Sequence, residues 1–376
     1  MALASPWSRE IAAALFQLGH EVHVVDFGEA PSAAAYLAAS DREQIDAIAG
    51  LAARGVVLHH IDSRWESRVR YLTGAPALAR IAHAVRADIV ITLYGGGFAT
   101  LALASMIRPY AVYVVGSDVL AARGIGRRLA RVALERAACV FANGGFLAAR
   151  TRELAPRADV RELCIGINPD QFIPADHGVG VARVVCTRGF LPVYNNGYLI
   201  EGLAARAADL PPVPVVFVSK GPELDAVRSL ADRSLTPAQR AAVEFLGGVG
   251  EEQLRRQLRG SQIYVSLSTS DGTSVSLLEA LATGLFPILS DIPQNREWIS
   301  EGAANGLLVP LDNPKALAGA IDTAVGDRAL RERAASFNRR LVRERADARR
   351  NLSLLAQDLA ALALSGRAGK QELPKG

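Results

Sequence analysis

The chain has 376 residues, with 42 Lys or Arg against 38 Asp or Glu and a formal net charge of +4. Half of the residues are hydrophobic, which excludes a disordered chain. The three cysteines, Cys139, Cys164 and Cys186, are scattered, so a disulfide scaffold is excluded and a reducing, cytoplasmic compartment fits best. No basic run alternates with aromatic residues, so nucleic acid is not an expected partner.

Short apolar runs alternate with helical segments along most of the chain. Apolar runs separated by helices predict parallel sheets that are covered on both faces. One uncharged stretch, 89–107, is long enough to be tested as a membrane span. Its three central glycines, 95–97, favour a strand, a turn and a helix instead. The predicted strands are 22–25, 56–58, 89–91, 112–115 and 139–141, then 184–186, 215–218, 243–246, 263–267 and 287–289.

The alternation pauses once, at a stretch rich in Pro and Gly around 166–178, which predicts a linker between two α/β domains. The strand that should precede the predicted helix at 8–18 has at most the residues 1–4. Either the start at Met1 is late or the sheet begins with a stub. We expect a first Rossmann-like domain at 1–170, a linker at 171–180, a second Rossmann-like domain at 181–330, helices at 331–365 that return to the first domain, and a tail at 366–376.

The segment 268–284 carries the clearest chemical signal. It follows the strand predicted at 263–267 and opens a helix with Gly272, Thr273, Ser274 and Val275, whose free N–H groups and positive dipole end suit a diphosphate. Asp271 and Glu279 flank these amides, and carboxylates accept hydrogen bonds from sugar hydroxyls. The alternative is that Asp271 caps the helix and Glu279 is an exposed helix residue. No Asp-x-Asp motif or His/Asp cluster indicates a metal.

This segment resembles the acid-x7-acid motif of the retaining, nucleotide-sugar-dependent glycosyltransferases of family 4, in which the first acid is usually Glu. Further segments resemble the motifs of that family, in the same order, from Ile11 to about Val325. The resemblance implies the GT-B fold, in which two Rossmann-like, doubly wound parallel-sheet domains face each other across a cleft. The matching segments are 19–22 ("GHEV"), 116–118 ("HGSD"), 165–172 ("NGVDxxxF"), 279–288 ("EAMAxGxPVV") and 305–310 ("NGLLVP").

The resemblance also implies roles on the donor side. Asp271 would contact the donor sugar, and Glu279 the ribose of the nucleotide. Arg188 matches the arginine that holds the diphosphate, and its planar fork suits phosphate oxygens. The family's lysine is replaced by Asn196, which supplies no charge. Lys220 either supplies that charge or is a solvated surface lysine.

On the acceptor side we expect Asp118 to be a catalytic residue that faces the acceptor, with Val115 where the family has His; Arg188 and Asp271 are the other expected catalytic residues. Gly96, within the glycine run, either lines the site or belongs to a plain strand-to-helix turn. Trp7, in the family's first loop, either stacks on a sugar or packs in the core. The other histidines are interpreted as structural or exposed.

A predicted helix at 121–136 carries Arg123, Arg127, Arg128 and Arg131 between apolar residues. It either rests on anionic lipid at the inner face of the membrane or is a solvated face. In sum, we expect a cytoplasmic, hexosyltransferase-type enzyme that needs neither metal nor cofactor. It would transfer a sugar from a UDP- or GDP-type donor to a glycan, lipid-linked or small-molecule acceptor with retention. The alternatives are a degenerate binding-only protein, a sugar-nucleotide epimerase or a phosphorylase of the same fold; a dehydrogenase ranks last because no GxGxxG follows a strand.

Overall fold

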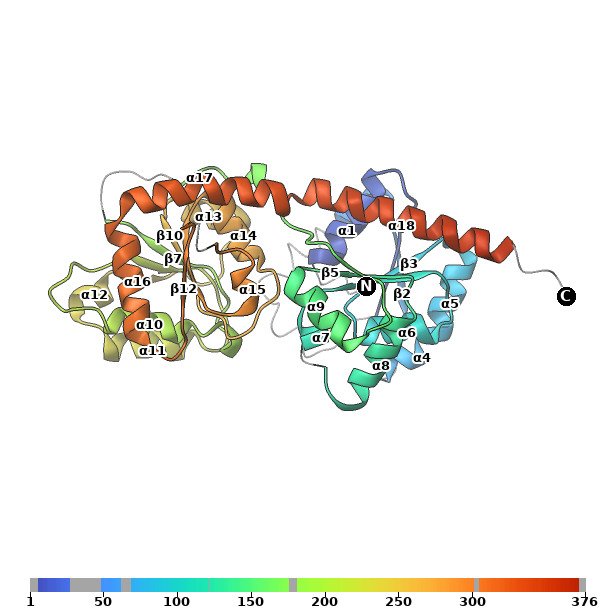
Figure 1. The fold of residues 1–376 in the computed structure, drawn as a ribbon, viewed down its shortest axis with the longest axis horizontal. Coiled ribbons are helices and arrows are strands. Elements are labelled where there is room, and N and C mark those ends of the chain that lie inside the picture. Colours follow the sequence, from blue (N-terminus) through green and yellow to red (C-terminus); the bar gives the residue numbers. More distant parts are fainter. Residues whose placement is uncertain are drawn as a thin grey trace. The chain divides into compact units, whose positions relative to one another are not determined.

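The computed structural model describes residues 6–27, 49–61, 69–120, 122–175, 181–300 and 304–371 (Figure 1). The chain forms two compact units. Unit 1 comprises Met1–Ile165 together with Arg349–Gly376, and unit 2 comprises Gly166–Ala348. Both units are built from parallel strands and helices, as predicted.

The strands of unit 1 form two separate parallel sheets. One contains the first two strands and the other contains the next four, in the order in which they occur in the chain. The strands are β1 (His23–Phe27), β2 (Val57–Ile61), β3 (Val90–Leu93), β4 (Tyr110–Val114), β5 (Cys139–Ala142) and β6 (Val160–Glu162). The helices are α1 (Pro6–Gln17), α4 (Arg70–Thr73), α5 (Ala75–Ala84), α6 (Gly97–Ala104), α7 (Ser117–Leu120), α8 (Gly124–Glu135), α9 (Gly145–Leu154) and α18 (Ala348–Gln371).

Unit 2 contains one parallel sheet with the strand order β12-β11-β10-β7-β8-β9. Its strands are β7 (Val184–Cys186), β8 (Val215–Phe217), β9 (Val243–Phe245), β10 (Ile263–Ser266), β11 (Phe286–Ser290) and β12 (Leu307–Val309). Its helices are η1 (Pro169–Gln171), η2 (Pro192–Tyr194), α10 (Asn196–Ala204), α11 (Leu224–Ser234), α12 (Pro237–Ala241), α13 (Glu251–Arg259), α14 (Val275–Thr283), α15 (Pro293–Arg296), α16 (Pro314–Gly326) and α17 (Arg328–Arg345).

The order of the strands in unit 2 defines a topological switch point. The chain runs from β7 outward to β8 and β9, and then crosses to the other side of β7 to form β10, β11 and β12. In open α/β sheets of this kind, ligands bind outside the carboxyl ends of the strands where the winding reverses. That place is the carboxyl edge of β7 and β10.

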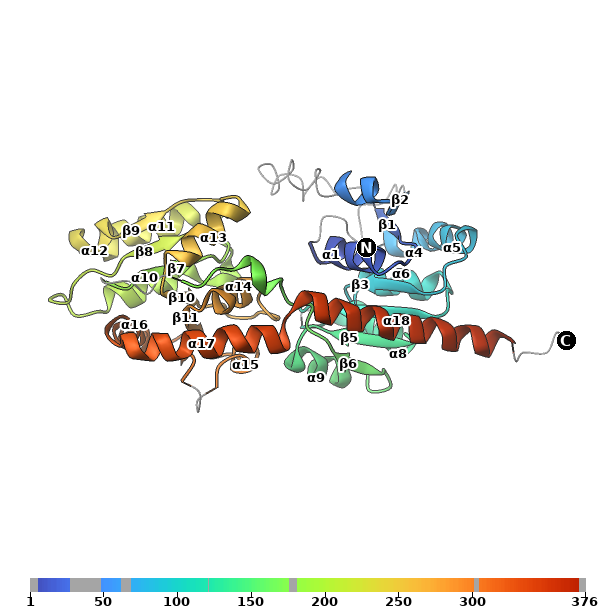
Figure 2. The ribbon, with the colours of Figure 1, turned by 90° about the horizontal axis from the view of Figure 1, so that it is seen from above.

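One of the two last helices differs from its prediction. The sequence predicted that both return to the first domain, but α17 packs against α14 in unit 2. The buried Asn338 of α17 explains this, because its amide donates hydrogen bonds to the carbonyls of Leu285 (3.1 Å) and Asn305 (3.0 Å). Only α18 belongs to unit 1, where Asp358 pairs with Arg161 of β6 at 2.9 Å. Figure 2 shows α18 lying across the strands of unit 1.

The uncharged stretch 89–107 forms β3, a turn and α6, which confirms the interpretation made from its glycines. Across the parts of the chain that the structure describes, no helix combines the length and the apolar character needed to cross a membrane.

Candidate active site

Two loops meet at the switch point of unit 2. One follows β7 and the other follows β10, and these strands are hydrogen-bonded neighbours. The backbone N–H of Thr269 donates to the carbonyl of Val193 at 2.9 Å and fixes one loop against the other. Since both loops leave the same edge of the sheet, the side chains predicted at 188 and 271 come together, although 83 residues separate them.

Arg188 is the centre of this site. One terminal nitrogen donates to the Asp271 carboxylate at 2.6 Å, and the other donates to the Ser274 hydroxyl at 2.5 Å. The guanidinium also lies 3.9 Å from the centre of the Tyr194 ring, within the range of a cation–π contact. Arg188 is only 7% exposed, and its Nε has no hydrogen-bond partner in the described structure. The site therefore holds an oriented cation with donor capacity to spare.

Asp271 is ionically paired but poorly solvated. Burial raises the pKa of its carboxyl group, while Arg188 and the N–H of Gly272 act in the opposite direction. For Arg188, burial lowers the pKa, but nearby Asp271 and Tyr264 outweigh this effect and raise it overall, so the guanidinium keeps its charge. The pair thus places one buried positive charge beside one poorly solvated negative charge.

The start of α14 differs from the prediction. Ser274 is the N-cap, because its hydroxyl accepts from the N–H of Leu277 at 3.4 Å, so the interpretation of Asp271 as a plain N-cap is wrong. The helix begins at Val275, and Gly272 to Ser274 lie in the preceding loop instead of the first turn. The N–H of Gly272 donates to Asp271 at 2.9 Å and is therefore already used within the protein.

Glu279 lies one turn after Val275 on the same face of α14, since residues four apart on a helix are neighbours. The opposite face is buried and contains Leu277, Leu278 and Leu281. Glu279 is half-buried, on a face that the core does not cover. Its position is consistent with a ligand contact.

Asn196 stands where the family has a lysine, but its side chain supplies no positive charge. It is buried at the start of α10, and its amide donates to the carbonyls of Arg188 (3.2 Å) and Gly189 (3.0 Å). Both amide hydrogens are thus used to shape the loop that carries Arg188. Lys220, after β8, has an exposed side chain, and its carbonyl accepts from the N–H of Phe190 at 3.1 Å.

Asp118, in unit 1, fastens two loops together. Its carboxylate accepts hydrogen bonds from the N–H groups of Gly95 (2.5 Å), Gly116 (2.7 Å) and Val115 (3.3 Å). Burial raises the pKa of this carboxyl group, and these backbone contacts lower it. Through these contacts Asp118 holds the turns after β3 and β4 together, and its expected catalytic role stays a prediction.

The three glycines beside Asp118, at 95–97, differ in the space that surrounds them. A side chain at Gly95 would meet Val114 at 2.9 Å, and one at Gly97 would overlap the ring of Tyr71. Gly96 faces open space, with no atom within 4 Å of the place of a Cβ. Trp7 lies at the start of α1, half-buried, and not in the predicted loop.

Helix α8 carries the predicted basic residues on an exposed, mixed face. Arg127, Arg128 and Arg131 are exposed, and Arg131 pairs with Glu135 at 3.0 Å. Between them runs an apolar row that is also exposed, and its members are spaced four and three residues apart. The row consists of Ile125 (77% exposed), Leu129 (39%) and Val132 (45%).

The sequence alone did not reveal the part played by Tyr194 or by the hydroxyl of Ser274. Tyr194 follows Arg188 by six residues within the same loop. This short spacing of an Arg and a Tyr after a strand was the one feature of the sequence that could have indicated their contact. The contact of Arg188 with Ser274 joins residues far apart in the chain, so no local pattern could show it.

Solved structures show the fold to which this architecture belongs. The structure of Anabaena Alr3699/HepE in complex with UDP matches with a TM-score of 0.75 and 16% identity, covering 95% of this chain and 97% of that one. Sucrose-phosphate synthase from Thermosynechococcus elongatus matches with a TM-score of 0.70 and 18% identity, covering 96% and 93%. The fold is therefore that of the GT-B glycosyltransferases.

Family models then identify each half of the chain. Residues 7–171 match the model of Glycosyltransferase Family 4, and residues 183–341 match that of Glycosyl transferases group 1. The chain belongs to the family-4-like, group 1 glycosyltransferases, as its motifs predicted.

Curated relatives match over shorter segments. The GDP-mannose:cellobiosyl-diphosphopolyprenol alpha-mannosyltransferase of Xanthomonas oryzae is 33% identical over 130 residues, which is 33% of this chain and 33% of that enzyme. The GtfA subunit of a UDP-N-acetylglucosamine–peptide N-acetylglucosaminyltransferase of Streptococcus agalactiae is 33% identical over 77 residues, or 20% of this chain. The match spans only 15% of that subunit's own length.

Proposed function

We propose that this protein transfers a sugar from a nucleoside-diphosphate sugar to an acceptor, with retention of the anomeric configuration. The observation that carries the proposal is the oriented Arg188, held by Asp271, Ser274 and Tyr194 at the switch point of unit 2. A diphosphate is the ligand chemistry that best matches a buried guanidinium fork beside the start of a helix.

In this proposal the donor lies along the carboxyl edge of β7 and β10. Its diphosphate contacts the guanidinium of Arg188 and the first free amides of α14. A carboxylate has about four acceptor sites, so Asp271 keeps a lone pair beyond those that Arg188, Gly272 and Ser268 occupy, and this lone pair can accept from a hydroxyl of the donor sugar. Glu279, one turn into α14, accepts from the ribose hydroxyls.

The protein's contribution to the reaction is then electrostatic. Negative charge grows on the diphosphate as the sugar departs, and a preorganised cation stabilises that charge more in the transition state than in the ground state. The leaving oxygen takes the acceptor's proton on the same face of the sugar, so no side-chain base is required. We propose that no metal or other cofactor takes part.

The acceptor is proposed to be a sugar, either free or attached to a carrier. The names of two relatives point to different carriers, a diphosphopolyprenol in Xanthomonas and a peptide in Streptococcus. The exposed face of α8 favours the lipid-linked class, because an apolar row flanked by arginines complements an anionic bilayer surface. We therefore propose peripheral contact with the cytoplasmic face of a membrane through Arg123, Arg127, Arg128 and Arg131.

A product assay separates transfer from the other activities of this fold. Purified protein is incubated with UDP- and GDP-sugars, with and without an acceptor mixture that includes polyprenyl-diphosphate sugars. Release of free UDP or GDP only when acceptor is present supports transfer, and the anomeric coupling of the product in NMR spectra reports retention. Isomerised donor without nucleotide release would indicate an epimerase. Donor binding without turnover would indicate a binding-only protein.

A further inference from the structure

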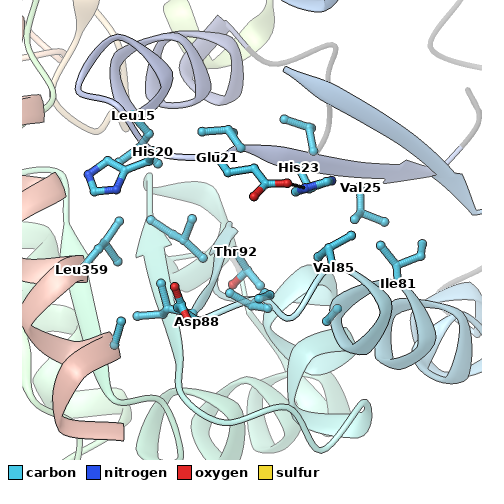
Figure 3. Close-up of a pocket in the computed structure, with 18 of the residues that line it drawn as sticks. Leu15, His20, Glu21, His23, Val25, Ile81, Val85, Asp88, Thr92 and Leu359 are labelled. Carbon is cyan, nitrogen blue, oxygen red and sulfur yellow. Dashed lines mark hydrogen bonds and ion pairs between the residues drawn. The ribbon is translucent and has the colours of Figure 1, made fainter. Parts of the chain in front are cut away.

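Unit 1 contains a cavity of about 450 Å3 that is lined mainly by aliphatic side chains, among them Leu15, Val25, Ile81 and Leu359 (Figure 3). A sugar bound against such walls would leave most of its hydroxyl groups without hydrogen bonds, which is unfavourable. The cavity is therefore a poor site for a donor sugar. The buried polar side chains of unit 2 differ from this lining, because they form a connected network that reaches Asp271.

A row of buried polar side chains leads from the end of β11 toward Asp271. Ser290 is the last residue of β11, Asn295 lies in the short helix α15 that follows, and Ser268 lies in the loop after β10. The two strands are hydrogen-bonded neighbours, so their carboxyl ends meet at one edge of the sheet. Ser268, Ser290 and Asn295 are each at most 6% exposed, and buried polar groups need partners within the protein.

The hydrogen bonds in this row run in one direction. The amide of Asn295 donates to the carbonyl of Ser290 at 2.8 Å and to its hydroxyl at 3.1 Å. The Ser290 hydroxyl then donates to the carbonyl of Ser268 at 2.6 Å. Because a carbonyl only accepts, the single hydrogen of the Ser290 hydroxyl is used there, and this hydroxyl must accept from Asn295. The orientation of the Asn295 side chain is thereby determined as well.

Ser268 connects the row to the carboxylate. Burial raises the pKa of the Asp271 carboxyl group, and the hydrogen bond with the side chain of Ser268 is one of the contacts that lower it. An ionised carboxylate only accepts, so the Ser268 hydroxyl donates to Asp271. The hydroxyl of Ser266 lies 3.4 Å from that of Ser268 and is therefore the donor of that pair.

The loop that carries Asp271 is thus held from both neighbouring strands. On the side of β7, the N–H of Thr269 donates to the carbonyl of Val193 at 2.9 Å. On the side of β11, the Ser290 hydroxyl holds the carbonyl of Ser268. These two contacts fix successive residues of the loop, and they leave the carboxylate of Asp271 little freedom to turn.

The segment around α15 places Asn295 within reach of Ser290. Asp291 and Arg296 form a doubly hydrogen-bonded ion pair across this segment, at 2.6 and 2.9 Å. The backbone N–H of Asn295 donates to the carbonyl of Ile292 at 3.0 Å. A bidentate pair of this kind fixes geometry, so the turn that carries Asn295 is itself held in shape.

We propose that Asn295 and Ser290 are positioning residues for Asp271, which they hold, through Ser268, in the orientation that meets a hydroxyl of the donor sugar. This inference rests on the proposed function, in which Asp271 contacts the donor sugar and Arg188 contacts the diphosphate. Loss of either positioning residue should therefore misplace the sugar while the nucleotide still binds. Since a misplacement of about 1 Å can lower a rate by about 100-fold, the effect is expected in kcat.

The first measurement is the pKa of Asp271, followed by its carboxyl 13C shift in the full-length protein. Ser268→Ala removes the direct hydrogen bond, so the pKa should rise by about 1 pH unit, the effect of one hydrogen bond to a charged group. Ser290→Ala should change the pKa in the same direction, but not when Ser268→Ala is already present, because Ser290 acts through Ser268. Ser290→Thr keeps the hydroxyl and should restore the wild-type pKa. The control is Asn338→Ala, which removes another buried amide of unit 2 and should leave this pKa unchanged.

The second measurement is the comparison of kcat with nucleotide affinity. Ser290→Ala and Asn295→Asp should each lower kcat about 10–100-fold, while the Kd for UDP or GDP stays near that of the wild type. Asn295→Asp keeps the size of the side chain, but an ionised carboxylate cannot donate to Ser290. A merely structural role would instead lower Tm and nucleotide affinity together.

An unchanged pKa of Asp271 in Ser290→Ala would overturn the proposal, and so would additive pKa changes in the double variant. Wild-type kcat in both Ser290→Ala and Asn295→Asp, or a joint loss of Tm and nucleotide affinity, would also overturn it. Failure of the proposed function has a different result, a wild-type protein that binds neither UDP nor GDP. The pKa values would still decide whether Ser290 and Asn295 position Asp271.

Discussion

The side chains around Arg188 hold its guanidinium group in one orientation. Its two terminal nitrogens are held by Asp271 and Ser274, and its face lies over Tyr194. Because these contacts fix the guanidinium before a donor arrives, little conformational entropy is lost when the diphosphate binds. In the proposed donor complex, Arg188 is therefore a preformed contact for the diphosphate.

The first prediction concerns this cation. Arg188→Ala should lower kcat/KM for the donor by about 10²–10³-fold, the usual loss when one preorganised charge-stabilising donor is removed. Arg188→Lys should restore less than a tenth of the lost activity, because lysine keeps the charge but lacks the planar fork. Steady-state kinetics with saturating acceptor measure both values. Arg256→Ala, at an exposed arginine of α13, is the matched control and should behave like the wild type.

Glu279 should act on binding more than on chemistry. Glu279→Gln keeps the size of the side chain but removes the negative charge, so hydrogen bonds to the ribose weaken. We expect the donor KM to rise about 10–100-fold with little change in kcat, since a bond to a charged group contributes about 1.5–3 kcal/mol. The control is Glu201→Gln, at an exposed position of α10. A donor KM that is equal in the two variants would contradict the assignment.

The pKa of the Asp271 carboxyl group should depend on its ion pair with Arg188. Burial raises its pKa and Arg188 lowers it, so in Arg188→Ala the pKa of Asp271 should rise further. A carboxyl group whose pKa is raised in the folded state destabilises the fold above that pKa and gains stability as the pH falls through it. As the pH falls from its raised pKa to the unfolded value of about 3.9, the free energy of unfolding should therefore increase more in the variant than in the wild type. Carboxyl 13C shifts in NMR spectra measure the pKa directly, and an unchanged value would argue against the pair.

At the scale of elements, α17 is attached to unit 2 through one buried amide. Asn338 donates to two carbonyls and accepts from the amide of Asn305 at 2.8 Å. Asn338→Ala leaves these partners buried and unpaired, at about 1–3 kcal/mol for each group, so the free energy of unfolding should fall by at least about 2 kcal/mol. Denaturant melts of the variant and of Ser336→Ala, at another site of the same helix, measure the difference. Equal midpoints would show that the amide contributes little.

Helix α8 is the second element with a specific expectation. Replacing Arg127, Arg128 and Arg131 together by Glu should abolish binding to vesicles that contain anionic lipid, while neutral vesicles should bind neither protein. Each basic residue near an anionic surface contributes about 1 kcal/mol, so the triple change should weaken binding more than about 100-fold. Co-sedimentation measures this, with Arg256→Glu as a control from unit 2. Wild-type binding by the triple variant would show that α8 has an ordinary solvated face.

The sequence predicted elements well wherever a local pattern determined them. Each predicted apolar run is a strand, because buried parallel strands require continuous apolar residues. The strands β6 and β12 were not predicted, since each has three residues and only one of them is buried. The contact of Ser274 with Arg188 and the unit against which α17 packs depend on residues that are distant in the chain.

In the candidate site, too, local patterns could be predicted from the sequence and contacts made by the fold could not. Arg188, Asp271 and Glu279 could be found from motifs, and the structure brings the first two within hydrogen-bond distance. The uses of Asn196 and Asp118 could not, because both side chains are taken up by backbone groups of loops that only the fold brings near. A family motif shows that a residue matters, but it does not distinguish a ligand contact from a contact that shapes the loop.

At the scale of the whole molecule, the proposed donor groups all belong to one unit. Arg188, Asp271, Ser274 and Glu279 lie within Gly166–Ala348. Nucleotide binding should therefore require no acceptor and no change in unit 1. This expectation separates the central claim, a diphosphate site in unit 2, from the identity of the acceptor.

Calorimetric titration of the full-length protein with UDP and GDP, without acceptor, tests that claim most directly. We expect one of the two nucleotides to bind, and we expect its Kd to rise at least about tenfold in both Arg188→Ala and Glu279→Gln but not in Arg256→Ala. The absence of binding by both nucleotides, or the same Kd for Arg188→Ala as for the wild type, would contradict the account.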